Sequence, residues 1–309
     1  MVLWMQADQG ADRTARPVCD YEGSGWRTAF WPGREYEDRA ERIALAHLLP
    51  PRGQRLCEIG AGFGRLADFY RGYERVILLD YARSMLVEAR DRLGGDPRFS
   101  FVAADLYNLP LAEGALDTAV TVRVLHHVAD IPRAFAEIAR VVRPDGAYVL
   151  EYANKRHVKA RLRHALTHRG PDPNGREPYE FVKLNFDFHP RYIEEELARV
   201  HLLTQDARAV STLRVPFLKR IVPPGLLASL DGALQHPTAA WQLAPSMFLC
   251  ARAEKSGEPK LNEALWRCPA CGSIEMEETL EALTCRACGK GYPVVEGIIE
   301  MKINQTINQ

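Results

Sequence analysis

Short apolar strands alternate with helices of about ten residues from Arg55 to Tyr152, and this rhythm limits the possible folds most severely. Strands that alternate with helices indicate βαβ units and a mostly parallel sheet. Both faces of such a sheet are buried, which explains near-continuous apolar runs such as Val76–Leu79. The sequence therefore predicts an α/β fold with a doubly wound, mostly parallel, seven-stranded sheet, whose strands are 55–59, 75–79, 99–103, 116–122, 147–152, 202–209 and 247–253. Helices are expected at 35–49, 63–71, 84–93, 131–142 and 191–200.

Breaks in this rhythm predict the domain organisation. The first residues are polar and irregular, and the stretch 254–264 is polar and contains glycine and proline, as linkers do. Four clustered cysteines follow that stretch. The predicted parts are an N-terminal arm (1–34), a main domain (35–253) with insertions at 154–189 and 211–246 that form an acceptor cap, a linker (254–264) and a small β-rich cysteine module (265–302).

The charge balance and the hydropathy pattern exclude several classes of protein. Among 309 residues, Lys+Arg and Asp+Glu are both 40, which argues against a general nucleic-acid binder, although a local basic patch would be hidden in the sum. No apolar run approaches the ~20 residues that span a bilayer. Met1–Gly10 has no basic region before an apolar stretch, so it does not resemble a secretory signal. We therefore expect a cytoplasmic protein without a transmembrane segment.

A glycine-rich turn, Gly60-Ala61-Gly62, follows the first predicted strand, and glycine lets a ligand approach the backbone closely. Asp80 ends the second strand and Asp105 follows the third, at the sheet edge where open α/β sheets bind ligands. Asp80 can accept hydrogen bonds from both ribose hydroxyls of a nucleoside, and Asp105 can accept one from an adenine amino group. An ordinary tight turn or a nicotinamide site is the alternative. The latter is disfavoured because the glycine spacing differs and no dehydrogenase catalytic set is visible.

Five motifs in order resemble the class I S-adenosylmethionine-dependent methyltransferases, in particular their type 11 group. The resemblance covers residues 35–155 well and 190–253 loosely, and it implies a Rossmann-like fold and methyl transfer from S-adenosylmethionine. The motifs are Leu56–Gly64, Leu79–Tyr81 with Ser84–Leu86, Ala104–Leu106, Asp117 with Val124–Val128, and Arg140–Gly146.

The same resemblance implies roles for individual residues at the cofactor. It places Gly60 and Gly62 against the amino-acid part, Asp80 on the ribose and Arg123 near the methionine portion. Glu58 is expected to support the loop, and the adenine is expected to be contacted by Tyr81, Met85, Asp105 and Leu106. The expected cofactor-binding residues are Glu58, Gly60, Ala61, Gly62, Asp80, Tyr81, Met85, Asp105, Leu106 and Arg123.

The sequence assigns no catalytic residue. A sulfonium methyl is already activated, so proximity and alignment supply much of the acceleration, and a general base is needed only if the acceptor holds its proton at neutral pH. His126 and His127 are candidates because histidine titrates in this range. However, His-His-Val is common at this point in the family whatever the substrate. The stretch Asp187–Pro190 is another candidate, although it also suits the entry to a helix.

Two C-x-x-C-G knuckles in the C-terminal module predict a metal site. Cys268, Cys271, Cys285 and Cys288 supply four thiolates, which suits tetrahedral zinc and leaves no open position, so the metal would be structural. The alternative is four free thiols. The ending Lys290–Met301 is similar to the small zinc-ribbon family that includes the activators of tRNA, rRNA and release-factor methyltransferases, which implies a ribbon with a built-in partner role.

The methyl acceptor, the acceptor atom and the oligomeric state are not determined by the sequence. The type 11 resemblance favours a small-molecule or lipid-precursor acceptor. The ribbon and the basic stretch Lys155–Arg169 favour RNA or a translation protein instead, because dense basic side chains suit phosphates, although the stretch also suits a solvated helix flank. The apolar stretch Val215–Leu234 is expected to form a packed lid over the site or to rest on a membrane surface. A third possibility is a non-catalytic module that only binds the cofactor or a partner.

Overall fold

The structure, a computed structural model, describes residues 18–24, 30–168 and 170–302, so the larger part of the expected N-terminal arm lies outside the described residues. The helices are α2 (Glu35–Leu48), α3 (Arg83–Leu93), α4 (Ile131–Val141), α5 (Val158–Thr167), α6 (Pro190–Arg199), α7 (Pro216–Ile221) and α8 (Pro224–Ala239). The short 3-10 helices are η1 (Ala67–Tyr70), η2 (Leu106–Asn108) and η3 (Leu125–His127). The strands are β1 (Gly53–Ile59), β2 (Tyr73–Asp80), β3 (Phe99–Ala103), β4 (Leu116–Thr121), β5 (Val142–Ala153), β6 (Tyr179–Val182), β7 (Asn185–Asp187), β8 (Leu202–Val210), β9 (Ser246–Ala253), β10 (Met276–Glu278), β11 (Ala282–Cys285), β12 (Gly291–Val295) and β13 (Ile298–Glu300).

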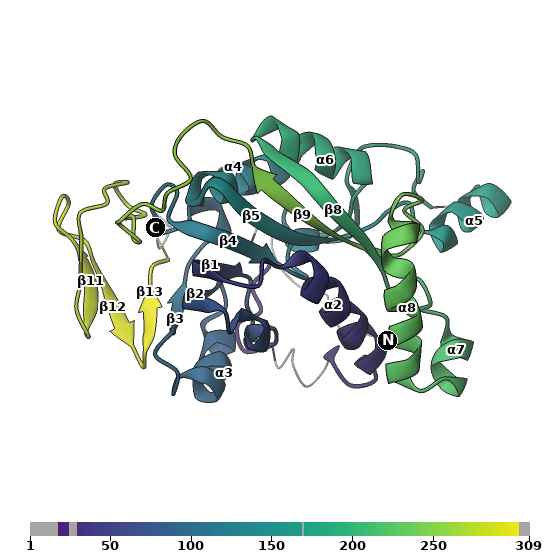
Figure 1. Ribbon diagram of the computed structural model, residues 1–309, viewed down its shortest axis with the longest axis horizontal. Helices are drawn as coiled ribbons and strands as arrows, with labels where there is room; N and C mark the ends of the chain where they lie inside the picture. The colour runs from purple at the N-terminus through teal and green to yellow at the C-terminus, as the bar shows by residue number, and fades with distance from the viewer. Residues whose placement is uncertain (1–17, 25–29, 169, 303–309) are drawn as a thin grey trace, which may run out of the picture.

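A twisted central sheet carries helices on both faces (Figure 1). Its main part has the order β3-β2-β1-β4-β5-β9-β8, with parallel pairing up to β5 and antiparallel pairing of β9 and β8. The predicted mostly parallel sheet of seven strands is therefore confirmed. Because the carboxyl ends of the parallel strands share one edge, the loops that follow β1, β2 and β3 come together there.

The two faces of the sheet bury different residues of the same strands. On β2, Ile77 and Leu79 join the core under α4 and α6, whereas Val76 and Leu78 join the core under α2, α3 and α8. Successive side chains of a strand point to opposite faces, so a continuous apolar run fills both cores. The expectation of a doubly wound fold drawn from these runs is confirmed.

The predicted helix at 63–71 is wrong. The chain there forms turns followed only by the short helix η1. Gly62 and Gly64 have φ angles of 54° and 69°, in the left-handed region, so a right-handed helix cannot pass through them. Too few residues remain before Tyr73, where β2 begins, for a regular α-helix with a useful buried face.

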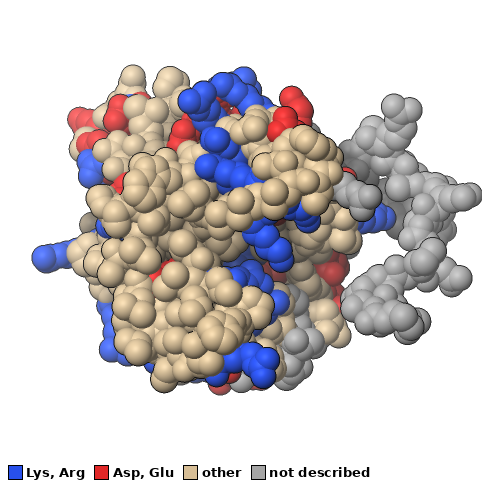
Figure 2. Space-filling view, turned by 90° about the vertical axis from the view of Figure 1, so that its right-hand side faces the viewer, with Lys and Arg blue, Asp and Glu red and all other residues tan. Residues whose placement is uncertain are grey.

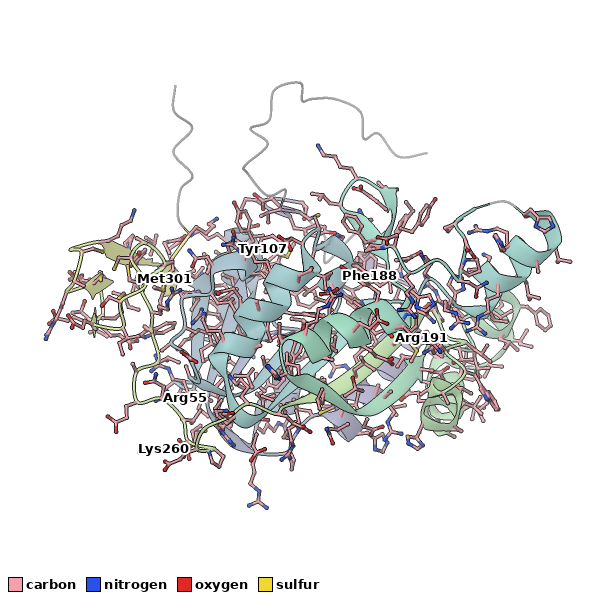
Figure 3. The ribbon with its side chains drawn as sticks, turned by 90° about the horizontal axis from the view of Figure 1, so that it is seen from above. Arg55, Tyr107, Phe188, Arg191, Lys260 and Met301 are labelled. Carbon is pink, nitrogen blue, oxygen red and sulfur yellow. The ribbon has the colours of Figure 1, made fainter. Side chains whose placement is uncertain are left out.

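The C-terminal module continues the main sheet. Strands β10 to β13 form an antiparallel ribbon, and β13 pairs in parallel with β3 through Ile298, Ile299 and Glu300. The Met301 N–H also donates to the Ala103 oxygen at 2.8 Å, and Figure 3 shows Met301 at the ribbon end of the molecule. The β-rich module was predicted, but its docking on the edge strand β3 was not. The ribbon therefore covers backbone groups that an edge strand would leave unpaired.

The segment 254–264 runs along the edge of the main sheet where the parallel strands begin. Lys255 donates from Nζ to the Ala139 oxygen at 2.7 Å, and Arg55 donates to the Asn262 oxygen at 2.7 Å. Figure 3 shows Arg55 close to Lys260 of this segment. Among the described residues, no helix has the length and apolar character needed to cross a membrane.

Candidate functional site

The glycine-rich loop after β1 is shaped by two glycines with different surroundings. Gly60 has a φ of 76°, and a Cβ there would lie 2.2 Å from Cγ2 of Val124, so no side chain fits. Gly62 has a φ of 54°, and no atom lies within 4 Å of the position that its Cβ would take. The open space beside Gly62 belongs to a pocket at the carboxyl edge of the sheet, which we name the edge pocket. A ligand can therefore approach the loop backbone there.

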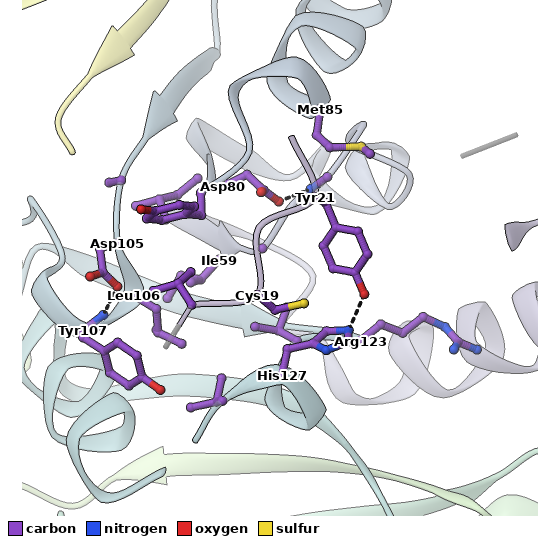
Figure 4. A pocket seen from close by; sticks show the side chains of 18 residues that line it. Cys19, Tyr21, Ile59, Asp80, Met85, Asp105, Leu106, Tyr107, Arg123 and His127 are labelled. Atoms are coloured by element: carbon purple, nitrogen blue, oxygen red, sulfur yellow. Dashed lines mark hydrogen bonds between the residues drawn. The ribbon is translucent and has the colours of Figure 1, made fainter. Parts of the chain in front are cut away.

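Asp80 lines the edge pocket at the end of β2 (Figure 4). Its Oδ2 accepts a hydrogen bond from the Gly62 N–H at 2.7 Å, and its Oδ1 accepts one from the Ala82 N–H at 2.8 Å. Burial raises the pKa of Asp80 to about 6, although the N–H groups of Ala82, Gly62 and Tyr81 oppose the rise. A carboxylate offers about four acceptor sites, so acceptor capacity remains for a ligand hydroxyl.

Another wall of the edge pocket comes from the segments that follow β2 and β3. Tyr81, Met85, Asp105 and Leu106 all line it. Asp105 is held in place because its Oδ1 accepts a hydrogen bond from the Tyr107 N–H at 2.9 Å, which caps η2. The structure thus brings together the residues expected around an adenine, with apolar and aromatic groups beside one carboxylate.

A second, smaller recess adjoins the edge pocket on the side of α2. Arg123 belongs to both cavities, and its guanidinium pairs with Glu41 of α2, whose side chain is only 3% exposed. Arg65 also reaches Glu41, at 2.7 Å. Two of the expected cofactor residues, Glu58 and Ala61, lie in this recess rather than in the edge pocket. The recess is lined by Trp31, Glu58, Gly60, Ala61, Gly62, Phe63, Arg65, Leu66, Val122 and Arg123.

Glu58 carries an incompletely satisfied carboxyl group in this recess. Its side chain is buried, and Oε2 has no hydrogen-bond partner among the described residues. Burial raises the pKa of Glu58 to about 8, although the nearby Tyr70 hydroxyl and the Arg65 guanidinium oppose the rise. A buried carboxyl oxygen without a partner is costly unless a ligand supplies one. The chemistry of the recess, with one carboxyl and two guanidinium groups, fits the ammonium and carboxylate groups of an amino acid.

Sequence reasoning missed the part of the site that the N-terminal segment contributes. Val18, Cys19 and Tyr21 line the edge pocket, and the Tyr21 hydroxyl lies 2.7 Å from Nε2 of His127. Gly23 donates to Oγ of Ser84 at 3.0 Å, which holds this segment beside α3. Nothing in the composition of this polar stretch distinguishes these residues, because their contacts depend on where the chain passes over the sheet edge.

His127 lies at the rim of the edge pocket in a neutral form. Its Nδ1 lies 2.9 Å from the Leu184 oxygen, which can only accept, so Nδ1 carries the proton and Nε2 accepts from Tyr21. Burial lowers the pKa of His127. The other histidine candidate, His189, caps α6 by accepting at Nδ1 from the Arg191 N–H at 3.1 Å. The helix-entry interpretation of Asp187–Pro190 is therefore the one that the structure supports.

The two insertions border a large cleft of about 1170 Å³, which we name the insertion cleft. The first insertion supplies His157, Lys159 and Arg163, and the second supplies Arg214 and Lys219. Helix α8 does not lie over the edge pocket, because its buried residues pack on α2 and β8. The hairpin of β6 and β7 does reach the rim of the edge pocket, through the contact of Leu184 with His127.

The four clustered cysteines of the ribbon meet at one point. Cys268, Cys271, Cys285 and Cys288 have sulfur atoms within 4.8 Å of one another. Tetrahedral zinc with Zn–S bonds of about 2.3 Å places sulfur atoms about 3.8 Å apart, and the distances are 3.8 Å for Cys268–Cys288 and 3.6 Å for Cys271–Cys285. Gly272 and Gly289, which follow the pairs, have φ angles of 81° and 72°, as the predicted knuckle turns require. The donor set therefore fits zinc.

Comparison with protein families matches the part of the chain that builds the edge pocket. Residues 57–150 match the family described as "Methyltransferase domain". The chain contains a methyltransferase domain. This stretch runs from within β1 to within β5 and holds most of the residues at the carboxyl edge of the sheet.

Curated relatives are similar over the same stretch. A malonyl-[acyl-carrier protein] O-methyltransferase of Geobacter sulfurreducens is 34% identical over 119 residues, which is 36% of this chain and 44% of the relative. A ubiquinone/menaquinone biosynthesis C-methyltransferase of Paracoccus denitrificans is 34% identical over 123 residues, which is 37% of this chain and 49% of the relative. The matched stretch thus spans less than half the length of each of these relatives.

Solved structures show the same fold. A structure of a complex between the Haloferax volcanii Trm112 methyltransferase activator and a methyltransferase contains a chain with a TM-score of 0.53 and 16% identity, covering 75% of this chain and 97% of that one. An S-adenosylmethionine-dependent methyltransferase of Listeria monocytogenes reaches a TM-score of 0.50 at 12% identity, covering 71% of this chain and 99% of that one. These likenesses establish the methyltransferase fold.

Proposed function

We propose that this protein transfers a methyl group from S-adenosylmethionine to a small-molecule or lipid-precursor acceptor. The observation that carries the proposal is the convergence of Gly62, Asp80 and Asp105 in the edge pocket, with Glu58 and Arg123 in the adjoining recess. Asp80 is proposed to hold the ribose, and Asp105 the adenine edge. Glu58 is proposed to bind the ammonium group and Arg123 to lie beside the carboxylate of the methionine portion.

The cofactor supplies an activated sulfonium methyl, so the residues of this chain need chiefly to position the two reactants. The loop at Gly60–Gly62 and the carboxylates fix the donor. The hairpin that contacts His127 through Leu184 is proposed to help position the acceptor together with the rest of the two insertions. The Nε2 atom of His127 can accept a proton from an acceptor hydroxyl if Tyr21 gives up its place there.

A second candidate acceptor is RNA or a protein of the translation apparatus. The observation that favours it is the basic lining of the insertion cleft, which includes Lys159, Arg163 and Lys219. The ribbon lies at the opposite end of the sheet from α5, α7 and α8, and it does not line that cleft (Figure 1). A small or lipid-like acceptor remains the better fit, since apolar side chains such as Val158 and Leu162 line the cleft as well.

Labelling with tritiated methyl groups tests both candidates. Purified protein and labelled S-adenosylmethionine are added to a cell extract that has been separated into RNA, protein and small-molecule or lipid fractions. We expect label in the small-molecule or lipid fraction. Label in RNA or protein alone would favour the second candidate. Binding of the cofactor without transfer to any fraction would contradict the proposed activity.

We also propose that the four cysteines hold one structural zinc ion, which would contribute much of the folding free energy of so small a ribbon. Metal analysis of protein purified without chelator should find about one zinc per chain. Cys285→Ser, at a buried position, should abolish the zinc content. The scattered Cys250, replaced in the same way, serves as the control. Metal-free wild-type protein with a folded ribbon would contradict this proposal.

A further inference from the structure

Helix α5 presents an apolar stripe to solvent. Val158, Leu162 and Leu166 are spaced four residues apart, so they lie on one side of the helix. Their exposed fractions are 44%, 57% and 80%, and Ala160 is the buried residue of this helix. Burial of such side chains normally stabilises helix packing, but no part of the described chain buries these three side chains.

Helices α7 and α8 also present apolar side chains to solvent. On α7, Phe217 is 66% and Ile221 is 60% exposed, and on α8 Leu226 and Leu230 are 55% and 50% exposed. Trp241, in the turn after α8, is 64% exposed. Single exposed apolar residues are ordinary, but three neighbouring stripes form the kind of surface that marks an interaction site.

These stripes belong to one side of the molecule, which we name the α5–α7–α8 face. Figure 1 shows all three helices at the same end of the sheet, and Figure 2 views that end directly. Arg161 of α5 donates to the Trp241 oxygen at 3.0 Å, which joins α5 to the turn after α8. The insertion cleft opens between the helices, with Val158 and Leu162 on one side and Val215 and Pro216 on the other.

The charge of this face is one-sided, although the chain as a whole has 40 basic and 40 acidic residues. Helix α5 carries Lys159, Arg161 and Arg163, and α7 carries Lys219 and Arg220. Figure 2 shows blue side chains running between broad tan areas on this side.

Carboxylates do not offset this charge within the three helices. Asp231 is the one acidic residue in their sequences, and it is fully buried, where it accepts hydrogen bonds from the Tyr36 hydroxyl and the Ser211 N–H. Other acidic residues do lie near the face. Glu37 is buried and paired with Lys219 at 2.8 Å, Asp172 lies 4.0 Å from His164 of α5, and Asp206 lies 3.9 Å from His236 of α8. Asp187 lines a cavity together with Lys159 and Arg163 of α5. The exposed surface of the helices is therefore apolar and basic.

We propose that the α5–α7–α8 face docks on the surface of an anionic phospholipid bilayer. Apolar side chains that enter the headgroup boundary, flanked by lysine and arginine, are the features by which helices bind such surfaces without crossing them. Anionic headgroups complement the basic residues, whereas two like-charged faces of this chain would repel each other. RNA would satisfy the basic groups but would leave Leu166 and Phe217 in water.

Docking in this way would place the mouth of the insertion cleft against the bilayer. An acceptor dissolved in the membrane could then reach the cleft without passing through water. The docking itself does not depend on the proposed methyl transfer, so each can fail without the other. Vesicle binding without transfer would leave the surface assignment intact, and transfer without vesicle binding would leave the enzyme assignment intact.

Sedimentation with extruded vesicles tests the proposal on the full chain. We expect binding to vesicles of phosphatidylcholine mixed with phosphatidylglycerol, little binding to phosphatidylcholine alone, and weakening by added salt. Leu162→Ser combined with Phe217→Ser should weaken binding by about tenfold or more. The control is Leu280→Ser in the ribbon, where the side chain is 96% exposed and the affinity should not change.

Charge reversal gives a second, independent measurement. Lys159→Glu should weaken binding to the mixed vesicles by at least about fivefold, because each basic residue near such a surface contributes about that much. Arg52→Glu, an exposed residue in the loop before β1, is the matched control. Circular dichroism should show all variants folded, since the altered side chains are exposed.

Three outcomes would overturn the proposal. The first is equal binding to both kinds of vesicle or to neither. The second is an equal loss of binding in the face variants and in their controls. The third is light scattering that shows a dimer which the face variants dissociate, because the stripes would then meet a second copy of the chain.

Discussion

Lys302, the residue that follows the ribbon strand β13 by two positions, donates from Nζ to the backbone oxygen of Tyr81 at 3.2 Å. The same nitrogen lies 5.0 Å from the centre of the Tyr81 ring, which lines the edge pocket. The end of the ribbon therefore touches a wall of the proposed cofactor site. Residues separated by 221 positions in the chain meet there because β13 pairs with β3.

The first prediction concerns this contact between ribbon and pocket. Ile298→Asp places a carboxylate at a fully buried position in β13, at a cost of about 3–5 kcal/mol. We expect the ribbon to leave β3 and the affinity for S-adenosylmethionine to fall several-fold, because Tyr81 and the Ala103 oxygen lose their partners. Titration calorimetry measures the affinity. Leu280→Ser serves as the ribbon control, and unchanged affinity in a variant with a detached ribbon would contradict the coupling.

Asp80 is predicted to make cofactor binding depend on pH. Its pKa is raised to about 6 by burial, and the carboxylate accepts stronger hydrogen bonds from ribose hydroxyls than the protonated acid does. The contribution of Asp80 to the affinity should therefore be complete above pH 7 and should be lost as the pH drops through about 6, by at most about tenfold per pH unit. Asp80→Ala should weaken binding severely and remove this dependence. Near-normal affinity in a folded variant would count against the site.

Glu58 is predicted to release a proton when the cofactor binds. Its pKa of about 8 in the free protein leaves it largely protonated at pH 7, and the ammonium group of the ligand would favour the charged carboxylate. Calorimetry at pH 7 in buffers with different ionisation enthalpies should detect a release approaching one proton per site. Glu58→Gln should bind more weakly and release none. The same release in wild type and variant would show that the proton comes from elsewhere.

The two loop glycines are predicted to respond differently to alanine. Gly60→Ala combines a left-handed backbone with a Cβ only 2.2 Å from Val124, so it should lower the melting temperature clearly. Gly62→Ala has the same backbone conformation, at a cost of about 1 kcal/mol, but meets no atom within 4 Å. Compared with Gly60→Ala, the Gly62→Ala variant should be destabilised less. Its affinity for the cofactor should fall more, because its methyl group enters the edge pocket. Equal effects of the two on affinity would argue against close approach of the ligand at Gly62.

The proposed donor half of the site follows largely from local sequence patterns. The strand before Gly60 and the strands ending near Asp80 and Asp105 are recognisable from their apolar runs, and parallel pairing brings their carboxyl ends to one edge. The cysteine pairs are equally local, since a knuckle needs only two cysteines, a glycine and a short hairpin. These features could be predicted because each is determined by residues that lie close together in the sequence.

The contacts that complete the candidate site and dock the ribbon were determined only by the tertiary structure. The pairing of Arg123 with Glu41, the passage of Tyr21 across the edge pocket and the docking of β13 on β3 all join segments far apart in the chain. Local patterns do not encode which edge strand a ribbon will meet, because any strand with free N–H and C=O groups offers the same bonds. The sequence by itself therefore determined the position of the proposed cofactor site. Which distant segments complete that pocket and which apolar helices stay exposed depended on how the whole chain packs.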